Sequence, residues 1–427
     1  MRYVPDRIKH LGIISTRLCG TDGVSLESAK WERVFEQAGF ICYYFAGELD
    51  RPPERSYLAK KAHFDHPEIR EINRHCFGVT RRDRSVTSKI QQIKRELKGH
   101  LYQFVERFHI DALVVENAVT IPMNIPLGIA ITEFLAETNM RAVAHHHDFY
   151  WERDVYAVNA VSDYLHMAFP PELPNIFHIV INSFAAEQLS FRTGISARII
   201  PNVMDFEHPP PPPDDYAADV RQALGISDDE LFILQPTRVV KRKGIEHAIE
   251  LVYRLKRRGM KAKLVISHAS GDEGYDYEQR LIEYSDMLGV QTLFESDIIK
   301  SKRGLTRDGR KIYTLADIYP HADLITYPST YEGFGNAFLE AVYFRKPIVV
   351  NKYSIYTKDI KPRGFWAIEL DGYVTREAVS KTVEILLNPE LRNQIVEHNY
   401  DLGKKFFSYS VLRRRLRTFM LENYWLL

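Results

Sequence analysis

The sequence is poor in cysteine, nearly neutral in charge, and without a long apolar run. Three cysteines, Cys19, Cys42 and Cys76, occur in 427 residues, so neither a disulfide framework nor a paired-cysteine metal site is indicated. This cysteine usage favours a reducing, cytoplasmic location. The net charge of +1 supplies no field that would attract nucleic acid, so no nucleic-acid partner is expected.

Apolar runs and a leader segment are also missing. No run approaches the roughly 20 apolar residues that span a bilayer, and the first residues lack an apolar signal core. We therefore expect no transmembrane segment. Residues 81–98 carry seven Lys or Arg against two Asp or Glu. Their apolar spacing predicts an amphipathic helix packed on its domain, while their charge alternatively suits an anionic acceptor or peripheral contact with a membrane.

Short apolar runs alternate with helical patterns along the first half, which predicts a doubly wound parallel α/β sheet. The predicted strands are His10–Ser15, Phe40–Phe45, Ala112–Val115, Arg141–His146, Phe177–Ile181 and Ala197–Ile200, and the predicted helices are Ser25–Ala38, Val86–Phe108, Pro126–Thr138 and Phe184–Phe191.

The pattern changes near residue 205, where an unbroken proline run at 209–213 predicts a stiff, extended connector. The alternation of strands and helices then restarts at Leu231 and continues to Asn351. Three helices follow, the last over Ser410–Tyr424. We therefore predict two domains, residues 1–205 with 410–427, and residues 206–409.

The most informative segment is Tyr331–Glu340, which reads Tyr-Glu-Gly-Phe-Gly-Asn-Ala-Phe-Leu-Glu. The run before it is typical of a buried strand, and the residues after Gly335 are typical of a helix. A helix N-terminus presents unpaired amides to an anion, and glycine allows a close approach of the backbone. Because Glu332 and Glu340 add carboxylates that accept hydrogen bonds from hydroxyl groups, this loop suits a sugar diphosphate.

This segment resembles the Glu-x7-Glu signature of retaining glycosyltransferases with the GT-B fold, in particular the sucrose-synthase-like family 4, or glycosyl transferases group 1. The resemblance implies two Rossmann-like domains that face each other across a cleft. It also implies that the last helix crosses back onto the N-terminal domain.

The resemblance further implies the residues of a donor site. Glu332 lies near the hydroxyls of the transferred sugar, and Glu340 accepts hydrogen bonds from the ribose. Ile298 belongs to the segment that runs along the base, although an ordinary strand end explains it equally well. The other implied donor-binding residues are Gly23, Gly333, Phe334, Gly335, Asn336 and Ala337.

Two cations follow the predicted strand that opens the second half. Arg238 and Lys243 have the spacing Arg-x4-Lys-Gly. At the carboxyl edge of a parallel sheet, such a pair can clamp a diphosphate and stabilise it as it leaves. The family has the same spacing, which implies a catalytic role for both, whereas we interpret Lys241 and Arg242 as surface residues.

Three consecutive histidines, His145–His147, end a predicted strand. Neighbours on a strand face opposite sides, so all three cannot share one metal, and no third ligand is evident for His145 and His147. No metal site is therefore predicted, and plain packing of the strand end is an alternative. The resemblance implies that one histidine contacts the transferred sugar. His147 is the best positional match and is assigned a catalytic role, with His145 or His146 as the fallback.

The acceptor side is expected in the first half, where polar residues follow predicted strands. Asp22 lies in a loop that is similar to the family's Gly-Gly-Val loop but does not fit the dinucleotide motif Gly-x-Gly-x-x-Gly. Glu116, Asp148 and Tyr150 are further candidate acceptor contacts.

The combined prediction is a retaining transferase that moves a hexosyl group from UDP-, GDP- or ADP-hexose to a hydroxyl of a small metabolite, a glycan or a lipid-linked sugar. No Asp-x-Asp triplet occurs, which fits a metal-independent site, and no cofactor is expected. A nucleotide-sugar epimerase, a glycan phosphorylase and a non-catalytic nucleotide- or carbohydrate-binding protein are the alternatives.

Overall fold

The computed structural model describes residues 8–20, 23–270, 276–423 and 425. The chain divides into two compact units, which we call unit 1 (residues 1–202 and 412–427) and unit 2 (residues 203–411). The proline run at 209–213 has neither helix nor strand structure and belongs to unit 2.

Unit 1 is built on a seven-stranded sheet with the order β3-β2-β1-β4-β5-β6-β7, in which all neighbouring strands are parallel. The strand order reverses between β1 and β4. At this point the Ser15 hydroxyl donates a hydrogen bond to the Glu116 carbonyl at 3.0 Å. Ligands of open parallel sheets bind beyond the carboxyl ends of the strands at such a reversal. The strands are β1 (His10–Ile14), β2 (Ile41–Ala46), β3 (Ser56–Leu58), β4 (Ala112–Glu116), β5 (Ala142–His146), β6 (Ile176–Val180) and β7 (Ala197–Ile199).

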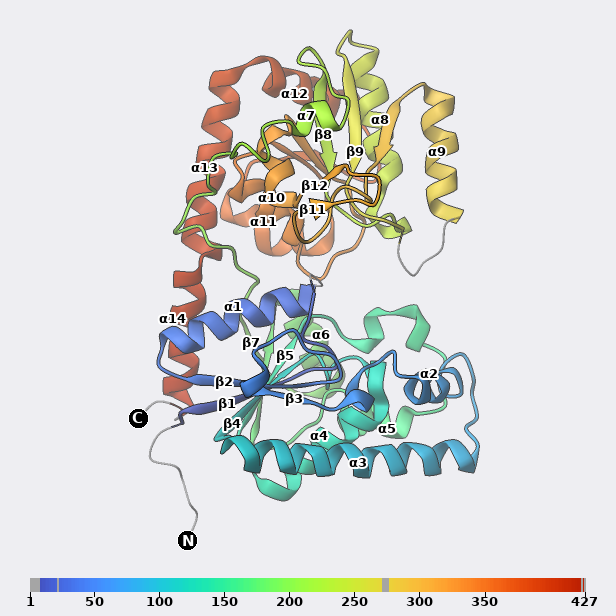
Figure 1. Cartoon of the computed structure of the whole chain (residues 1–427), viewed down its shortest axis with the longest axis vertical. Helices are drawn as coiled ribbons and strands as arrows, with labels where there is room; N and C mark the ends of the chain where they lie inside the picture. Colours follow the sequence, from blue (N-terminus) through green and yellow to red (C-terminus); the bar gives the residue numbers. More distant parts are fainter. Residues whose placement is uncertain (1–7, 21–22, 271–275, 424, 426–427) are drawn as a thin grey trace. The chain divides into compact units, whose positions relative to one another are not determined.

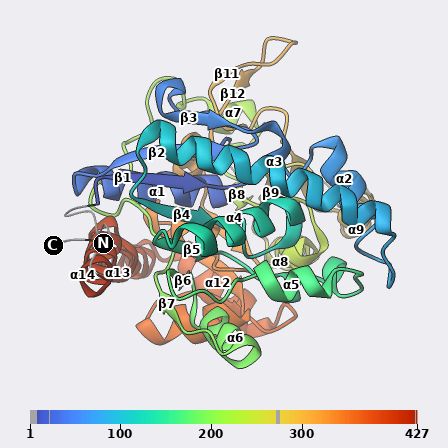
Figure 2. The same cartoon turned by 90° about the horizontal axis from the view of Figure 1, so that it is seen from below.

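Helices cover both faces of this sheet. Helix α1 (Gly23–Gln37) lies on one face, and α3 (Arg84–Phe108) and α4 (Ile125–Thr138) lie on the other (Figure 1). Figure 2 shows α3 and α4 side by side over the strands. Their apolar stripes bury side chains such as Phe104 and Ile129 in the main core of unit 1. The remaining helices before residue 203 are α2 (Pro67–Arg74), α5 (Ser162–Ala168) and α6 (Ser183–Thr193).

Several positive charges of residues 81–98 are paired within unit 1. The ammonium groups of Lys94 and Lys98 lie 2.7 and 2.8 Å from the carboxylate of Glu133, which belongs to α4. Arg82 pairs with Asp163 at 2.7 Å. These contacts support the reading of residues 81–98 as an amphipathic helix packed on its domain. Within the described residues, no helix combines the length and apolar character needed to cross a bilayer.

The last helix, α14 (Tyr409–Glu422), packs against unit 1. The ring of Phe419 meets Phe177 of β6 edge-on at 5.6 Å. Arg413 donates to the side chain of Gln37 at 2.7 Å, and Arg415 donates to the Ile199 carbonyl at 2.6 Å. The predicted return of the final helix to the N-terminal half is confirmed.

Unit 2 repeats the doubly wound design with a six-stranded parallel sheet in the order β10-β9-β8-β13-β14-β15. Here the order reverses between β8 and β13. The sheet strands are β8 (Leu231–Gln235), β9 (Ala262–Ile266), β10 (Gln291–Phe294), β13 (Leu324–Tyr327), β14 (Ile348–Asn351) and β15 (Ile368–Leu370). A hairpin is formed by β11 (Gly304–Leu305) and β12 (Lys311–Ile312).

The helices of unit 2 include α8 and α11, which follow the two strands at the reversal. The helices of this unit in the described residues are α7 (Val220–Ala223), α8 (Ile245–Lys256), α9 (Asp276–Leu288), α10 (Leu315–Ile318), α11 (Asn336–Tyr343), α12 (Arg376–Leu387) and α13 (Pro389–Phe407). Side chains of α8 and the central strands, such as Ile249 and Leu264, form the core. The predicted fold class, with two doubly wound parallel-sheet halves, is confirmed.

Candidate functional site

The loops at the reversal point of unit 2 are tied to each other. After β8 the chain forms a 3-10 turn over Lys241–Lys243, and the amide of Thr330, beyond β13, donates to the Arg242 carbonyl at 2.8 Å. Gly244 has a φ of +58°, and a Cβ there would lie 2.6 Å from the Pro328 carbonyl oxygen. Glycine is therefore needed after Lys243, because this position combines a left-handed backbone with close contact to the opposite loop.

The predicted residues Lys243 and Glu332 form an ion pair between these two loops. The ammonium of Lys243 contacts Oε1 of Glu332, and both side chains are 9% exposed. Arg242 lies 3.2 Å from Oε2, the other oxygen of the same carboxylate. Burial alone would raise the pKa of Glu332, but the charges of Lys243 and Arg242 outweigh burial, and the net shift is downward. Glu332 is thus held as a carboxylate by two cations.

Arg238, the second predicted cation, is exposed to solvent. Within the described residues its guanidinium has no hydrogen-bond or ion-pair partner. The charge of Arg238 nevertheless affects His268, which lies beyond β9. Burial lowers the pKa of His268 most, and the charges of Arg238 and Lys243 lower it further. The carboxyl edge of this sheet therefore carries a surplus of positive charge, as an anion site requires.

The glycine-containing loop leads directly into α11, as predicted. Gly335 has a φ of +116°, and a Cβ there would lie 2.2 Å from the hydroxyl of Tyr353. That hydroxyl donates to the Phe334 carbonyl at 3.1 Å. The Phe334 side chain is buried against Phe407, so only its backbone is placed to meet a ligand. Gly333, Asn336 and Ala337 lie in the same loop and first helical turn.

Two further predicted donor residues differ in their surroundings. Glu340, in α11, accepts a hydrogen bond from the hydroxyl of Tyr319 at 2.8 Å, and this buried tyrosine stacks on Phe344. Ile298 is 2% exposed, and its carbonyl accepts from the Tyr313 amide at 2.7 Å. Glu340 is therefore oriented by a fixed partner, whereas Ile298 sits in the packed interior.

In unit 1, the end of β4 lies beside the histidines at the end of β5. Glu116 pairs in register with His145. Oε2 of Glu116 accepts hydrogen bonds from Nδ1 of His145 at 2.9 Å and from Nε2 of His147 at 3.2 Å. The two histidines share a face because they are two residues apart on an extended chain. Glu116 therefore lies beneath both rings and is buried.

The charges in this cluster are set by mutual contact. Burial alone would raise the pKa of Glu116, but His145 and His147 lower it to about 2. Burial would lower the pKa of His147, but its hydrogen bond to Glu116 outweighs this, and the net shift is upward. Burial lowers the pKa of His145. The contact with Glu116 therefore favours the protonated form of His147, whereas burial favours the neutral form of His145.

The ligand atoms of Glu116, His145 and His147 lie within 4.8 Å of one another, a spacing that could surround a metal ion. The premise that no third ligand accompanies the two histidines was therefore wrong, because a strand remote in sequence supplies it. Hydrogen bonds already join Oε2 of Glu116 to both histidines, while Oε1 of Glu116 and Nε2 of His145 are buried without a hydrogen-bond partner in the described part of the chain. The absence of a metal stays a prediction.

Helix α1 adds two buried residues that the sequence analysis did not single out. The ring of Trp31 stacks on His145 with centroids 4.1 Å apart. Glu27 is 1% exposed, and its charge acts on both His145 and His147. Glu27, Trp31 and Phe35 recur at intervals of four residues, so they lie on one helical face. That spacing was the available signal for a carboxylate on the buried side of α1.

Other predicted contacts of unit 1 have different partners. Both ring nitrogens of His146 are used, by Thr120 at 2.6 Å and His178 at 2.9 Å, so His146 has no ring nitrogen left for a ligand. Asp148 accepts from Asn117 at 3.2 Å and from Arg153 at 2.6 Å.

The remaining candidates lie at loop ends. Tyr150 is half-buried and meets Trp151 edge-on at 5.1 Å. Gly23 is the exposed first residue of α1. Asp22 lies outside the described residues.

Comparison with known proteins places this arrangement in a family. The model of the family "Glycosyl transferases group 1" matches residues 309–401. Mannosylglucosylglycerate synthase of Petrotoga mobilis is 31% identical over 95% of this chain and 99% of its own length. The enzyme of the same name from Thermotoga maritima is 31% identical over 91% of this chain and 94% of its own length. The chain belongs to the glycosyl transferases group 1 family.

Solved structures show the same fold at low sequence identity. Anabaena HepE, solved in complex with UDP-glucose, covers 97% of this chain and 99% of its own with a TM-score of 0.63 and 12% identity. Together with the two parallel sheets, such similarity establishes the GT-B architecture. The chain is a glycosyltransferase.

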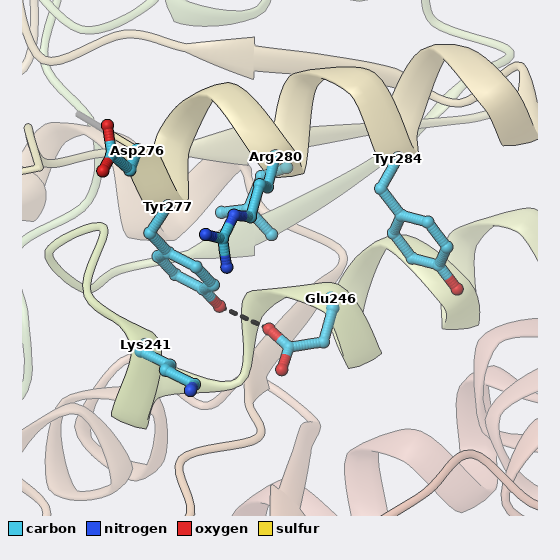
Figure 3. Close-up of a pocket in the computed structure, with 7 residues that line it drawn as sticks. Lys241, Glu246, Asp276, Tyr277, Arg280 and Tyr284 are labelled. Atoms are coloured by element: carbon cyan, nitrogen blue, oxygen red, sulfur yellow. Dashed lines mark hydrogen bonds between the residues drawn. The ribbon is translucent and has the colours of Figure 1, made fainter.

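A separate cavity of about 520 Å³ lies between α8 and α9 of this glycosyltransferase (Figure 3). Lys241, Arg280 and Tyr284 line it, and on its wall the hydroxyl of Tyr277 donates to the carboxylate of Glu246. None of the predicted site residues is among its lining residues. This cavity is therefore distinct from the candidate donor site at the loops after β8 and β13.

Proposed function

We propose that this glycosyltransferase is a retaining, metal-independent enzyme that moves a hexosyl group from a nucleotide sugar to an acceptor hydroxyl. We further propose that the hexose is mannose and that the product is mannosylglucosylglycerate. One observation carries the proposal: Lys243 and Glu332 pair between the loops after β8 and β13, at the reversal point of unit 2, where ligands of such a sheet bind. The charge of Arg238 acts on Lys243, and α11 begins directly after the second of these loops.

The proposed chemistry follows from the charges at that point. As the bond between sugar and phosphate breaks, negative charge accumulates on the departing diphosphate. Arg238 and Lys243 supply positive charge that stabilises the departing diphosphate. Glu332 takes the hydroxyls of the transferred sugar, and Glu340 takes the ribose. For His147 of unit 1 we propose a hydrogen bond to a sugar hydroxyl. The departing phosphate assists deprotonation of the acceptor hydroxyl on the same face of the sugar, which retains the anomeric configuration.

Two comparisons support the choice of ligands. The two relatives that cover almost the whole chain are both named mannosylglucosylglycerate synthases, which supports a glucosylglycerate acceptor. The structural neighbour HepE was solved with UDP-glucose, which supports a nucleotide sugar as the donor class. The base, whether uracil, guanine or adenine, is part of the test below.

A cytoplasmic location belongs to the same proposal. Cys19, Cys42 and Cys76 are free thiols, which persist in a reducing compartment. An anionic, water-soluble acceptor would need no contact with a membrane, and Lys94 and Lys98 of α3 are paired with Glu133.

The test combines purified protein, glucosylglycerate and, in parallel, UDP-, GDP- or ADP-mannose in the presence of EDTA. We expect one donor to give mannosylglucosylglycerate and an equal amount of nucleoside diphosphate, and NMR of the new anomeric centre to show the configuration of the donor. Loss of activity with EDTA that is restored by a divalent cation would contradict metal independence. Inversion at the anomeric centre would contradict retention.

The same reactions separate the alternatives. An epimerase would convert the donor without acceptor, and a phosphorylase would require inorganic phosphate. A non-catalytic binding protein would shift in melting temperature with the donor but release no diphosphate. Parallel incubations with a glycan and a lipid-linked sugar test the other acceptor classes.

A further inference from the structure

Glu332 is the buried carboxylate of the candidate donor site, and it is shared between two cations that differ in burial. Lys243 reaches Oε1 from the interior with its ammonium 5.4 Å from the centre of the Tyr327 ring. Arg242 reaches Oε2 from the surface, with its side chain 37% exposed. Each cation therefore occupies a different oxygen of the same carboxylate.

Arg242 is held in this position by more than the ion pair. Its guanidinium also donates to the Tyr331 carbonyl at 3.3 Å. Its own carbonyl accepts from the amide and the hydroxyl of Thr330 at 2.8 and 3.2 Å. The side chain and backbone of Arg242 thus connect the turn after β8 to the loop after β13. The initial interpretation of Arg242 as a surface residue overlooked these contacts because they join segments 88–90 residues apart.

A bound diphosphate would compete with Glu332 for the ammonium group of Lys243. Its ammonium now neutralises Glu332, but the proposed function also requires it to bind the anionic donor. A buried carboxylate that loses its only cation is strongly destabilised and takes up a proton. A second cation on the other oxygen avoids this outcome. Arginine suits the role, because its guanidinium stays charged and can donate to several acceptors at once.

We propose that Arg242 is a positioning residue that keeps Glu332 ionised and in place when the Lys243 ammonium turns to a diphosphate. This inference rests on the proposed function for the identity of the diphosphate, but its test needs only the anion. Among the residues that the structure describes, the other side chains that interact with the Glu332 carboxylate are those of Tyr327, Ser329 and Tyr353, which carry hydroxyls. Hydroxyls carry no positive charge, so they cannot replace Arg242.

The experiment is calorimetric titration of the full-length protein with inorganic pyrophosphate at pH 6.5, in two buffers of different ionisation enthalpy. The difference between buffers gives the number of protons taken up on binding. We compare wild type with Arg242→Gln, Arg242→Lys and the double variant Arg242→Gln/Glu332→Gln. The matched control is Lys241→Gln, which removes the same charge from the same turn.

We expect Arg242→Gln to bind pyrophosphate at least tenfold more weakly than wild type and to take up as much as one additional proton per site. Arg242→Lys should recover most of both properties. The double variant should show no additional proton, because the carboxylate that accepts it is gone. Lys241→Gln should match wild type. A general loss of structure would not give proton uptake that depends on Glu332.

Two results would overturn the inference. Arg242→Gln could bind pyrophosphate with the affinity and proton uptake of wild type, in which case Arg242 does not protect Glu332. Wild type could fail to bind pyrophosphate at all. In that case nothing competes with Glu332 for Lys243, and the donor-site assignment is wrong as well. If pyrophosphate binding behaves as expected but no sugar is transferred, the proposed function fails while the role of Arg242 stands. Melting temperatures of all variants confirm that each is folded.

Discussion

The polar clusters of the two units are built in opposite ways. In unit 2, Arg242 and Lys243 both contact the single carboxylate Glu332, and Arg238 is an exposed third cation of the same sheet edge. In unit 1, the carboxylate Glu116 accepts from two buried imidazoles, so its charge is matched within the cluster. A surplus of exposed positive charge suits an anion, whereas a carboxylate buried between two imidazoles fixes the orientation of those rings, which suits a neutral partner. We infer that unit 2 handles the diphosphate and that His147 of unit 1 handles hydroxyl groups.

The largest effect is expected from removing the cations of unit 2. Arg238→Ala/Lys243→Ala should lower kcat/KM for transfer by at least about 100-fold, because preorganised stabilisation of the departing charge is lost. It should also abolish measurable binding of the nucleoside diphosphate. Arg254→Ala, which removes an exposed arginine of α8 paired with Glu250, is the matched control. Full activity of the double variant would remove the basis for the donor site.

Changes in unit 1 should separate the two clusters. His147→Ala should lower kcat about 10- to 100-fold, the worth of a hydrogen bond from a charged group, with no change in the affinity for nucleoside diphosphate. Glu116→Gln should act in the same direction and lower the pKa of the His147 ring, which NMR of labelled histidine measures. Weakened diphosphate binding in these variants would show that the cluster of unit 1 also affects the diphosphate, which would contradict the separate roles inferred for the two units.

Glu340 allows a finer test within unit 2. Tyr319→Phe removes only the hydroxyl that donates to Glu340, so KM for the donor should rise about fivefold, the effect of one neutral hydrogen bond, while kcat is unchanged. Tyr313→Phe, which loses a comparable hydrogen bond to Asp219, should leave KM unchanged. A fall in kcat without a change in KM would show that Tyr319 does not act through ribose binding.

The smallest expected effect concerns pH and the second histidine pair of unit 1. Burial lowers the pKa of His178 from 6.5 to about 4, so the unfolded chain takes up this proton more readily than the folded chain. The contribution of His178 to the free energy of unfolding therefore decreases as the pH falls through 6.5. Between pH 7 and 6 wild type should lose about 0.7 kcal/mol more than His178→Gln. Calorimetric unfolding at the two pH values measures this, and equal losses would place His178 in contact with solvent.

Much of unit 2 was predictable because its signals are contiguous in sequence. The run Leu324–Tyr327, the glycines around Phe334 and the helix to Tyr343 occur in the predicted order of strand, loop and helix. The alternation of apolar runs and helical patterns likewise predicted both doubly wound sheets. The short strands β3, β11, β12 and β15 were missed because a run of two or three residues has little detectable period, although β7, of the same length, was predicted.

The cluster of unit 1 was only partly predictable, since it depends on strand register. Glu116 and His145 are neighbours because β4 and β5 pair in that register, and the sequence separation of 29 residues gives no hint of it. Strand geometry alone predicted that His146 faces away from His145 and His147. It could not predict which of the two faces contacts Glu116. The contacts of Arg242 with Glu332 and Tyr331 were not predictable for the same reason, because these partners lie on a different loop.

The most direct test of the account is a crystal structure of the protein with the nucleotide sugar that it accepts. The account predicts that the diphosphate lies within hydrogen-bonding distance of Arg238, Lys243 and the amides at the start of α11, with the ribose on Glu340. A diphosphate bound instead in the cavity between α8 and α9, away from Glu332, would contradict it.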